Sequence, residues 1–89
     1  MKSEYLPTFI KDLKSLKSTP VYTRIKNIAF QDILSCQNLS DISNLKKLKG
    51  EDNAYRIRIG DYRIGFFLTG NTITFCRVLH RREFYHYFP

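Results

Sequence analysis

Apolar residues in the first part of the chain recur with the period of an amphipathic helix. Four of them stand three or four positions apart, at Leu6, Phe9, Leu13 and Leu16. This spacing places the apolar side chains on one face of a helix, and the lysines between them fall mostly off that face. We therefore predict a first helix that ends near Ser18.

A second apolar stripe follows after a short break. Thr19 and Pro20 have the order of a helix N-cap and a first helical residue, where the missing N–H of proline costs nothing. Polar, turn-forming residues occupy 38–44, so this second helix is expected to end near Gln37. Two adjacent helices with a short break predict an αα-hairpin. The stripe itself consists of Val21, Ile25, Ile28, Ala29 and Ile33.

The apolar pattern changes to a period of two in the second half of the chain. Residues 55–59 and 62–68 alternate between apolar and other side chains, and 72–79 is rich in β-branched and aromatic residues. Glycine-containing turns separate these segments, so three strands of an antiparallel meander are predicted. A short strand over 2–6 is a further candidate for a sheet edge.

Together these elements predict the α+β class, with two N-terminal helices packed on one face of a curled antiparallel sheet. The tail over 80–89 is either a turn of helix or an extended arm. With 89 residues and no linker or internal repeat, residues 1–89 are expected to form one domain. That length excludes a doubly wound nucleotide-binding fold and a TIM barrel.

Composition narrows the expected cellular setting. An apolar content of 43% is too high for a disordered chain, yet no apolar run approaches the roughly 20 residues that span a bilayer. The N-terminus also lacks the apolar stretch of a signal peptide. Cys36 and Cys76 have no CxxC spacing and are interpreted as small buried apolar residues. We expect a protein of the reducing cytoplasm, without a membrane partner.

The charge of the chain points to a polyanionic partner. Fifteen Lys and Arg stand against eight Asp and Glu, and the pI is near 9.7. Nucleic acid is the commonest such partner, although many small proteins are basic for solubility alone. Nine of the fifteen cations fall in 46–89, against four acids. They form three clusters, at Lys46, Lys47 and Lys49, at Arg56, Arg58 and Arg63, and at Arg77, Arg81 and Arg82.

Strand alternation gives the central cluster a common direction. If the apolar residues of the strands face the helices, then Arg56, Arg58 and Arg63 face the other way, because a one-residue slip would bury the arginines. Like charges opposite each other in a sheet are unfavourable, and the planar guanidinium suits phosphate. We interpret the cluster as a phosphate-binding face, extended by Arg77 and Arg81. Solvated arginines near carboxylates are the alternative.

Three segments of the second half, taken together, resemble a known family. They are K-L-K-G at 47–50, Y-R-I-R-I-G-D-Y-R-I at 55–64 and V-L-H-R-R-E-F-Y at 78–85. Their order and spacing, with two helices ahead of them, are similar to the RelE/ParE superfamily of type II toxins. The resemblance covers nearly the whole chain and implies the RelE-like microbial RNase-type fold.

The activity implied by the resemblance depends on the branch. RelE-type members are ribosome-dependent endoribonucleases that cut mRNA in the ribosomal A site, with no metal or other cofactor. The RNA 2′-hydroxyl attacks the adjacent phosphate to give a cyclic phosphate. ParE-type members share the fold but inhibit DNA gyrase, and a cognate antitoxin neutralises the toxin in a hetero-oligomer. We expect the RelE-like activity, with a ParE-like gyrase inhibitor as the first alternative and an inactive toxin fold or plain RNA-binding module as the second.

The resemblance also implies roles for individual residues. Arg56 and Arg58 fall on the basic pair of the family, and Arg63 falls on the arginine that follows Tyr in the next strand. Arg81 falls on the arginine of the C-terminal motif, and these cations would stabilise phosphate. Tyr85 falls on the tyrosine that stacks on a base.

The basic pair departs from the family pattern in one respect. A RelE-type pair includes a lysine favoured as the general base, whereas arginine effectively never loses its proton. His80 is the first candidate for proton transfer, and His86 in the Tyr-His-Tyr ending is the second. A hydrogen-bonded strand-end residue is the alternative for His80, and a solvated tail residue is the alternative for His86.

We expect the four phosphate-binding arginines, Arg56, Arg58, Arg63 and Arg81, to end within one concave patch. No residues are assigned as metal ligands. Further RNA contacts are expected from Lys46, Lys47, Lys49, Arg77, Arg82 and His86.

Overall fold

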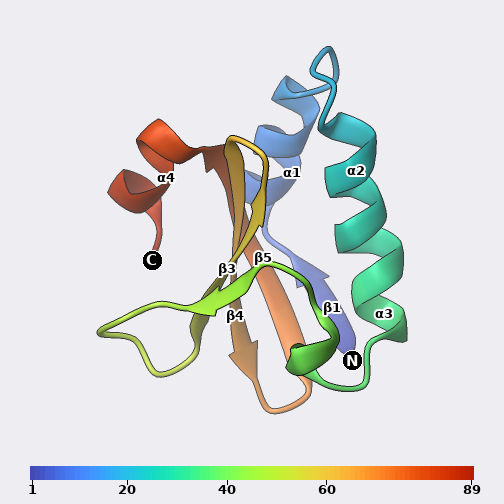
Figure 1. Cartoon of the computed structure of the whole chain (residues 1–89), viewed down its shortest axis with the longest axis vertical. Coiled ribbons are helices and arrows are strands. Elements are labelled where there is room, and N and C mark those ends of the chain that lie inside the picture. Colours follow the sequence, from blue (N-terminus) through green and yellow to red (C-terminus); the bar gives the residue numbers. More distant parts are fainter.

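The computed structural model describes all 89 residues and shows an α+β fold around a five-stranded sheet with the order β1-β5-β4-β3-β2 (Figure 1). None of its helices is both long and apolar enough to cross a membrane. The strands are β1 (Lys2–Tyr5), β2 (Leu45–Lys47), β3 (Ala54–Ile59), β4 (Tyr62–Thr69) and β5 (Thr72–His80). The helical elements are α1 (Pro7–Ser15), α2 (Tyr22–Asn27), a π turn (Ile28–Asp32), α3 (Ile33–Ser35), a 3-10 turn (Leu39–Asp41) and α4 (Arg81–Tyr87).

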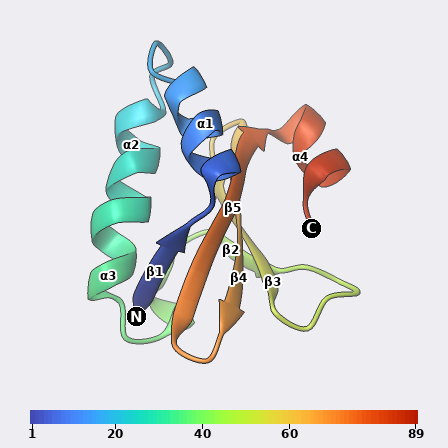
Figure 2. The same cartoon turned by 180° about the vertical axis from the view of Figure 1, so that it is seen from behind.

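The sheet is mixed, which corrects the prediction of a purely antiparallel sheet. The predicted meander is present as β3, β4 and β5, and the unpredicted β2 extends it at one edge. At the other edge β1 pairs with β5 in parallel, with Tyr5 opposite Phe75. The next element continues along β5, and the Thr8 hydroxyl of α1 donates to the Cys76 carbonyl at 2.8 Å. β1 and α1 therefore run along β5 in the same sense (Figure 2).

Two helical segments precede the meander, as the two apolar stripes predict, but their ends differ from the prediction. The Thr19 hydroxyl donates to the Leu16 carbonyl at 2.7 Å, just beyond the end of α1. The second helix begins at Tyr22 without a side-chain cap, so the assignment of Thr19 as its N-cap is wrong. An N-terminal αα-hairpin is not confirmed: the chain begins with a strand, and a turn over 16–21 separates the two helices.

The main core lies between the sheet and the helices of the N-terminal half. As the alternation predicts, apolar side chains of β3 and β4 point into it. The buried residues of this core are Phe9, Leu13, Ile25, Ala29, Ile33, Ile57, Ile59, Ile64, Phe66, Ile73, Phe75 and Val78.

A smaller core covers part of the opposite sheet face. The tail forms α4, the first of its two predicted conformations, and this helix lies across the sheet from α1 (Figure 1). Phe84 and Phe88, four positions apart, bring α4 and the residue after it onto the strands. The buried residues of this second core are Leu48, Ala54, Cys76, Phe84 and Phe88.

The close approach of the tail to the sheet depends on Gly65. The regular pairing of β4 with β5 is shifted between Gly65 and Phe66, and the ring of Phe88 lies directly over this point. A Cβ atom at Gly65 would stand 2.6 Å from Cδ2 of Phe88, which is inside van der Waals contact. Glycine is therefore required here by packing, as expected where another group approaches a strand closely.

Tyr5 connects the edge strand to the π turn of the second helix. Its hydroxyl donates to the Ala29 carbonyl at 2.8 Å, and its ring stacks on Phe30 and Phe75 with centroids 4.4 and 5.3 Å away. A π turn widens the helix and interrupts the usual ladder, which opens a carbonyl to a side-chain donor. Burial raises the pKa of the Tyr5 hydroxyl above its ordinary value.

Replacing Tyr5 with Phe should lower the free energy of unfolding at neutral pH by about 1 kcal/mol, because the bond to Ala29 is lost while the stacked ring remains. Urea denaturation measures this difference. The raised pKa of Tyr5 adds stability that is present below the ordinary tyrosine pKa and is lost as pH rises through the raised value. The two proteins should therefore converge in stability at alkaline pH, and a constant gap would contradict this role.

Gly65→Ala should destabilise the fold by about 1–3 kcal/mol, because its methyl group overlaps the Phe88 ring. Phe88→Ala removes that ring, so Gly65→Ala should cost less in the Phe88→Ala background. Chemical denaturation of the four proteins in this double-mutant cycle gives the coupling. The same cost in both backgrounds would show that Gly65 is required for another reason.

Candidate functional site

Four arginines share the sheet face that α4 partly covers. Across neighbouring strands Arg58 stands opposite Arg63, and Arg56 and Arg77 both stand opposite Gly65. Residues paired across strands point to the same side of a sheet. Gly65 lies under Phe88 of the smaller core, which identifies the side. The arginines therefore lie on the face away from the main core, in the direction that strand alternation predicts.

The guanidinium groups of these arginines end at different places. Nη1 of Arg56 donates to the Asn44 carbonyl at 2.7 Å, and Nη2 of Arg58 donates to Oδ1 of Asn44 at 3.4 Å. Nη1 of Arg63 instead donates to the carbonyls of Gly60 and Tyr62, at 2.8 and 3.0 Å. The basic pair is thus held at the β2 edge, while Arg63 is held at the turn between β3 and β4.

Arg81 joins Arg63 at this turn. Its backbone N–H donates to the Asp61 carbonyl at 2.7 Å, and its Nε lies 3.7 Å from Oδ1 of the same residue. The side chains of Arg81 and Asp61 are largely exposed, so this contact neutralises little of the Arg81 charge. Arg63 and Arg81 therefore form a second group of cations available to an anion.

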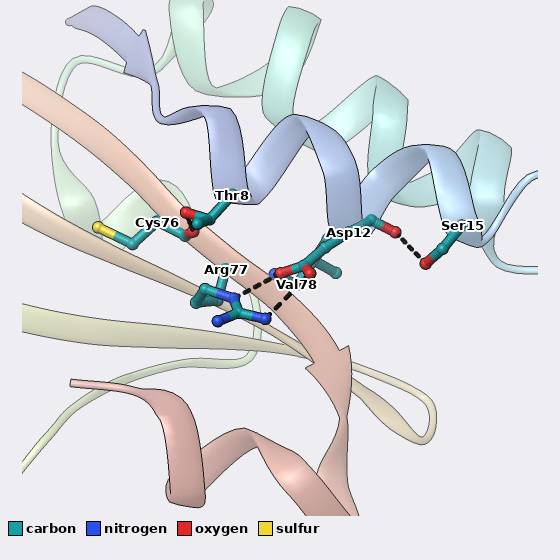
Figure 3. A network of polar contacts seen from close by, with 6 residues as sticks. All are labelled: Thr8, Asp12, Ser15, Cys76, Arg77 and Val78. Atoms are coloured by element: carbon teal, nitrogen blue, oxygen red, sulfur yellow. Dashed lines mark hydrogen bonds and ion pairs between the residues drawn. The ribbon is translucent and has the colours of Figure 1, made fainter.

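Arg77 is held in a third place by Asp12 of α1 (Figure 3). Its Nε and Nη2 donate to the two carboxylate oxygens at 2.7 and 3.1 Å, and the Val78 N–H donates to Oδ2 of Asp12 at 3.1 Å. The hydrogen bond to Asp12 raises the pKa of Arg77 further. The guanidinium carbon also lies 5.3 Å from the ring centre of Tyr87. The Arg77 guanidinium, predicted to contact RNA, is thus already paired with a carboxylate.

His80 ends β5 and is the N-cap of α4. Its Nδ1 accepts a hydrogen bond from the Arg82 N–H at 3.2 Å, which leaves Nε2 as its free ring nitrogen. It stands opposite Tyr62 in the sheet, with ring centroids 5.3 Å apart. Because Tyr62 packs against the main core, alternation places His80 and Arg63 on opposite sides of the same end of the sheet.

Helix α4 presents polar aromatic residues to solvent. Tyr85 is 58% exposed and Tyr87 is 55% exposed, and His86 between them meets the Tyr87 ring edge-on at 5.0 Å. Arg82 in the first turn is also exposed. Since Phe84 and Phe88 anchor the helix to the arginine face, Tyr85 and His86 lie on the same side of the molecule as the arginines.

The lysine cluster lies on and after β2. Lys46 stands opposite Arg56 in the sheet, which adds a third cation to the β2 edge. Lys47 and Lys49 line a shallow hollow together with Glu51 and Asp52. All three lysines are exposed, so they are available to a partner of opposite charge.

The four arginines predicted to bind phosphate do not share a hollow, in contrast to the expected single concave patch. One hollow, of about 330 Å³, lies between the second helix and the loop before β2, and Arg58 alone of the four lines it. Arg56, Arg63 and Arg81 line neither hollow. The reason is that each guanidinium bends toward a nearby carbonyl or carboxylate.

Both thiols are free; Cys76 is buried, as interpreted from the sequence, whereas Cys36 is only half-buried. Burial raises the pKa of Cys76, and burial together with Asp41 and Asp32 raises the pKa of Cys36. Both groups therefore stay protonated at neutral pH and are poor nucleophiles.

Sequence reasoning missed Asp12 and Asn44, the two residues that hold arginines of this face. Asp12 is an acid among the lysines of the first helix, and that pattern was its only signal. Asn44 lies in the polar stretch 38–44, which indicates a turn and nothing about its partners. Neither role follows from local pattern, because both partners are distant in the chain.

Comparison with known proteins agrees with this fold. The model of the family described as "ParE toxin of type II toxin-antitoxin system, parDE" matches residues 4–85. Toxin RelE3 of Methanocaldococcus jannaschii is 47% identical over 93 aligned positions that cover all of both chains. In the RelB–RelE antitoxin–toxin complex from Methanococcus jannaschii, a chain aligns with a TM-score of 0.77 and 44% identity, covering 97% of this chain and 99% of that chain. The Escherichia coli DinJ–YafQ complex aligns with a TM-score of 0.76 over 94% and 97% of the two chains, and its 18% identity shows the fold alone.

The chain belongs to the RelE/ParE superfamily of type II toxins. The family match and the full-length relative together establish this, and they confirm the membership predicted from the three sequence segments.

Replacing Asp12 with Asn should lower the free energy of unfolding by about 1–3 kcal/mol, because a hydrogen-bonded, half-buried ion pair loses one charge. Asp32→Asn is the matched control, since Asp32 is exposed and forms no ion pair. Urea denaturation compares the two variants. Equal stability of Asp12→Asn and the control would mean that the pair contributes nothing to the fold.

Proposed function

We propose that this toxin is a ribosome-dependent endoribonuclease that cleaves mRNA in the ribosomal A site without a metal. The observation that carries the proposal is the presence of two groups of cations: Arg56 with Arg58 on the sheet face that α4 partly covers, and Arg63 of the same face with Arg81 at the turn between β3 and β4. Neither group has a close acid to neutralise it, apart from the exposed contact to Asp61. Such a face suits the charge of RNA phosphates and of a phosphorane.

The chemistry requires proton transfers in addition to cations. The 2′-oxygen forms a bond to phosphorus, the bond from phosphorus to the 5′-oxygen breaks, and the products are a cyclic phosphate and a free 5′-hydroxyl. A base takes the 2′-hydroxyl proton and an acid supplies the proton of the leaving oxygen. Arginine cannot act as the base, so His80 through Nε2 and His86 on α4 are the candidates. Tyr85, exposed on α4 next to His86 in the chain, would position a base by stacking.

The proposed partner besides the ribosome and mRNA is a cognate antitoxin. The similar chain from Methanococcus jannaschii was solved in a RelB–RelE complex, which supports a hetero-oligomer here. An acidic or amphipathic segment of the antitoxin would lie against the basic face. The cytoplasm, where ribosomes and mRNA meet, is the proposed location.

The second candidate is inhibition of DNA gyrase, without cleavage. The match of residues 4–85 to a family described as ParE toxin favours it. The 47% identity to a protein named Toxin RelE3 favours the nuclease. An arginine face without a proton-transfer group would suffice for a gyrase inhibitor, so the two readings differ in their need for a histidine.

A reporter mRNA in a reconstituted translation system, with primer extension to map the cuts, tests the proposal. Wild type should cut only when ribosomes are present, and Arg81→Ala should lower the rate about a hundredfold. Lys26→Ala is the matched control, because it removes one exposed cation from α2 on the other side of the sheet. Intact mRNA together with blocked supercoiling by gyrase would replace the nuclease with the second candidate.

The histidine roles are separated by a pair of substitutions at one position. His80→Asn keeps a good N-cap for α4 and removes the imidazole, whereas His80→Ala removes both. Loss of cleavage in both variants assigns proton transfer to His80. Loss of cleavage in His80→Ala alone shows that His80 acts as the N-cap of α4 and not in proton transfer. His86→Gln then tests His86, the other candidate for proton transfer.

A further inference from the structure

Asn44 is the only residue other than glycine with a positive φ, at 62°. Asparagine tolerates this left-handed conformation better than most residues. The conformation turns both oxygens of Asn44 toward β3. Its carbonyl accepts from the Arg58 backbone N–H at 3.1 Å and from Nη1 of Arg56 at 2.7 Å, and its Oδ1 accepts from Nη2 of Arg58 at 3.4 Å.

These contacts hold two like charges side by side. Arg56 and Arg58 point to the same face of β3 and repel each other, and the oxygens of Asn44 offset part of that repulsion. No other side-chain hydrogen bond fixes either guanidinium, and Nε of Arg56 is buried without a partner. Asn44 is therefore the residue that sets where both groups end.

The contacts leave the pair able to bind an anion. Only Nη1 of Arg56 and Nη2 of Arg58 are engaged by side-chain hydrogen bonds, so the remaining Nη donors stay open to phosphate oxygens. Because Asn44 is uncharged, it orders the guanidiniums without neutralising them. A paired carboxylate, such as Asp12 at Arg77, would do the opposite.

We propose that Asn44 is a positioning residue that presents Arg56 and Arg58 to RNA phosphate as a pre-ordered pair. The choice of RNA as the ligand of this pair rests on the proposed function. Pre-ordering lowers the side-chain entropy lost when phosphate binds.

Two substitutions at Asn44 separate its contributions. Asn44→Gly keeps the left-handed backbone and the carbonyl that holds Arg56, and it removes only the Oδ1 contact to Arg58. Asn44→Asp keeps an acceptor for Arg58 but adds a negative charge beside the pair. Asn71→Asp is the control for net charge, because Asn71 lies in the turn before β5, toward the opposite edge of the sheet from β2.

The first measurement is ¹⁵N relaxation of the Nε–H groups of Arg56 and Arg58, which requires neither RNA nor cleavage. In Asn44→Gly the mobility of Arg58 should rise while that of Arg56 stays as in wild type. The second is the affinity for a fluorescein-labelled oligouridylate over a range of salt concentrations. Asn44→Gly should bind the oligouridylate about threefold more weakly, and Asn44→Asp about tenfold more weakly. For Asn44→Asp, the dependence of affinity on salt concentration should also correspond to about one fewer released ion.

Unchanged Arg58 mobility and unchanged oligouridylate affinity in Asn44→Gly would overturn the inference. A lower melting temperature of that variant with unchanged mobility would also overturn it, since it would show a purely structural role. An equal loss of affinity in Asn71→Asp and Asn44→Asp would assign the effect to net charge. If wild type cleaves no mRNA, the proposed function fails, while Arg58 mobility still decides the role of Asn44.

Discussion

The ion pair between Asp12 and Arg77 is the contact on which the arrangement of both helical layers depends. The same carboxylate accepts from the Val78 N–H, so α1 is held to the backbone of β5 as well as to one of its side chains. On the other side of the sheet the guanidinium lies against Tyr87 of α4. A single charged pair thus relates the position of α1 to that of α4, although the two helices belong to different cores. The hydrogen bond from Thr8 to the Cys76 carbonyl is a second polar contact between α1 and β5, but it does not reach α4.

The periodicity of apolar residues predicted the parts of the fold in which one face of an element is buried in the main core. The alternation in β3 and β4 assigned the main-core residues correctly, because burial on one face leaves a period-two signal. It could not predict β2, since Leu45–Lys47 is short and mostly charged and is a strand only because β3 offers it a partner. Thr19-Pro20 had the composition of a helix start, but the Thr19 hydroxyl found a nearer acceptor at Leu16. The coverage of the second face depended on Gly65, whose small size matters only once Phe88 is in place.

The candidate site shows the same division at the level of side chains. The direction of Arg56, Arg58 and Arg63 follows from the strand period, and the structure agrees with it. The positions of their charged ends do not follow from it, because a long side chain bends to whichever oxygen lies within reach. His80 was chosen for its chemistry, yet its Nδ1 is engaged at the start of α4. Hydrogen bonds between residues distant in the chain therefore decide which predicted groups remain free.

The two cores differ greatly in size, and this difference determines how readily each part of the structure opens locally. Twelve buried residues hold the N-terminal helices to the sheet, whereas five hold α4. Regions with few buried apolar contacts open in local fluctuations well below the free energy of global unfolding. Backbone amides of α4 should therefore exchange with solvent deuterium through such local openings, whereas those of the central strands should exchange only through global unfolding. Helix α4, which covers part of the arginine face, therefore opens more readily than the strands that carry the arginines.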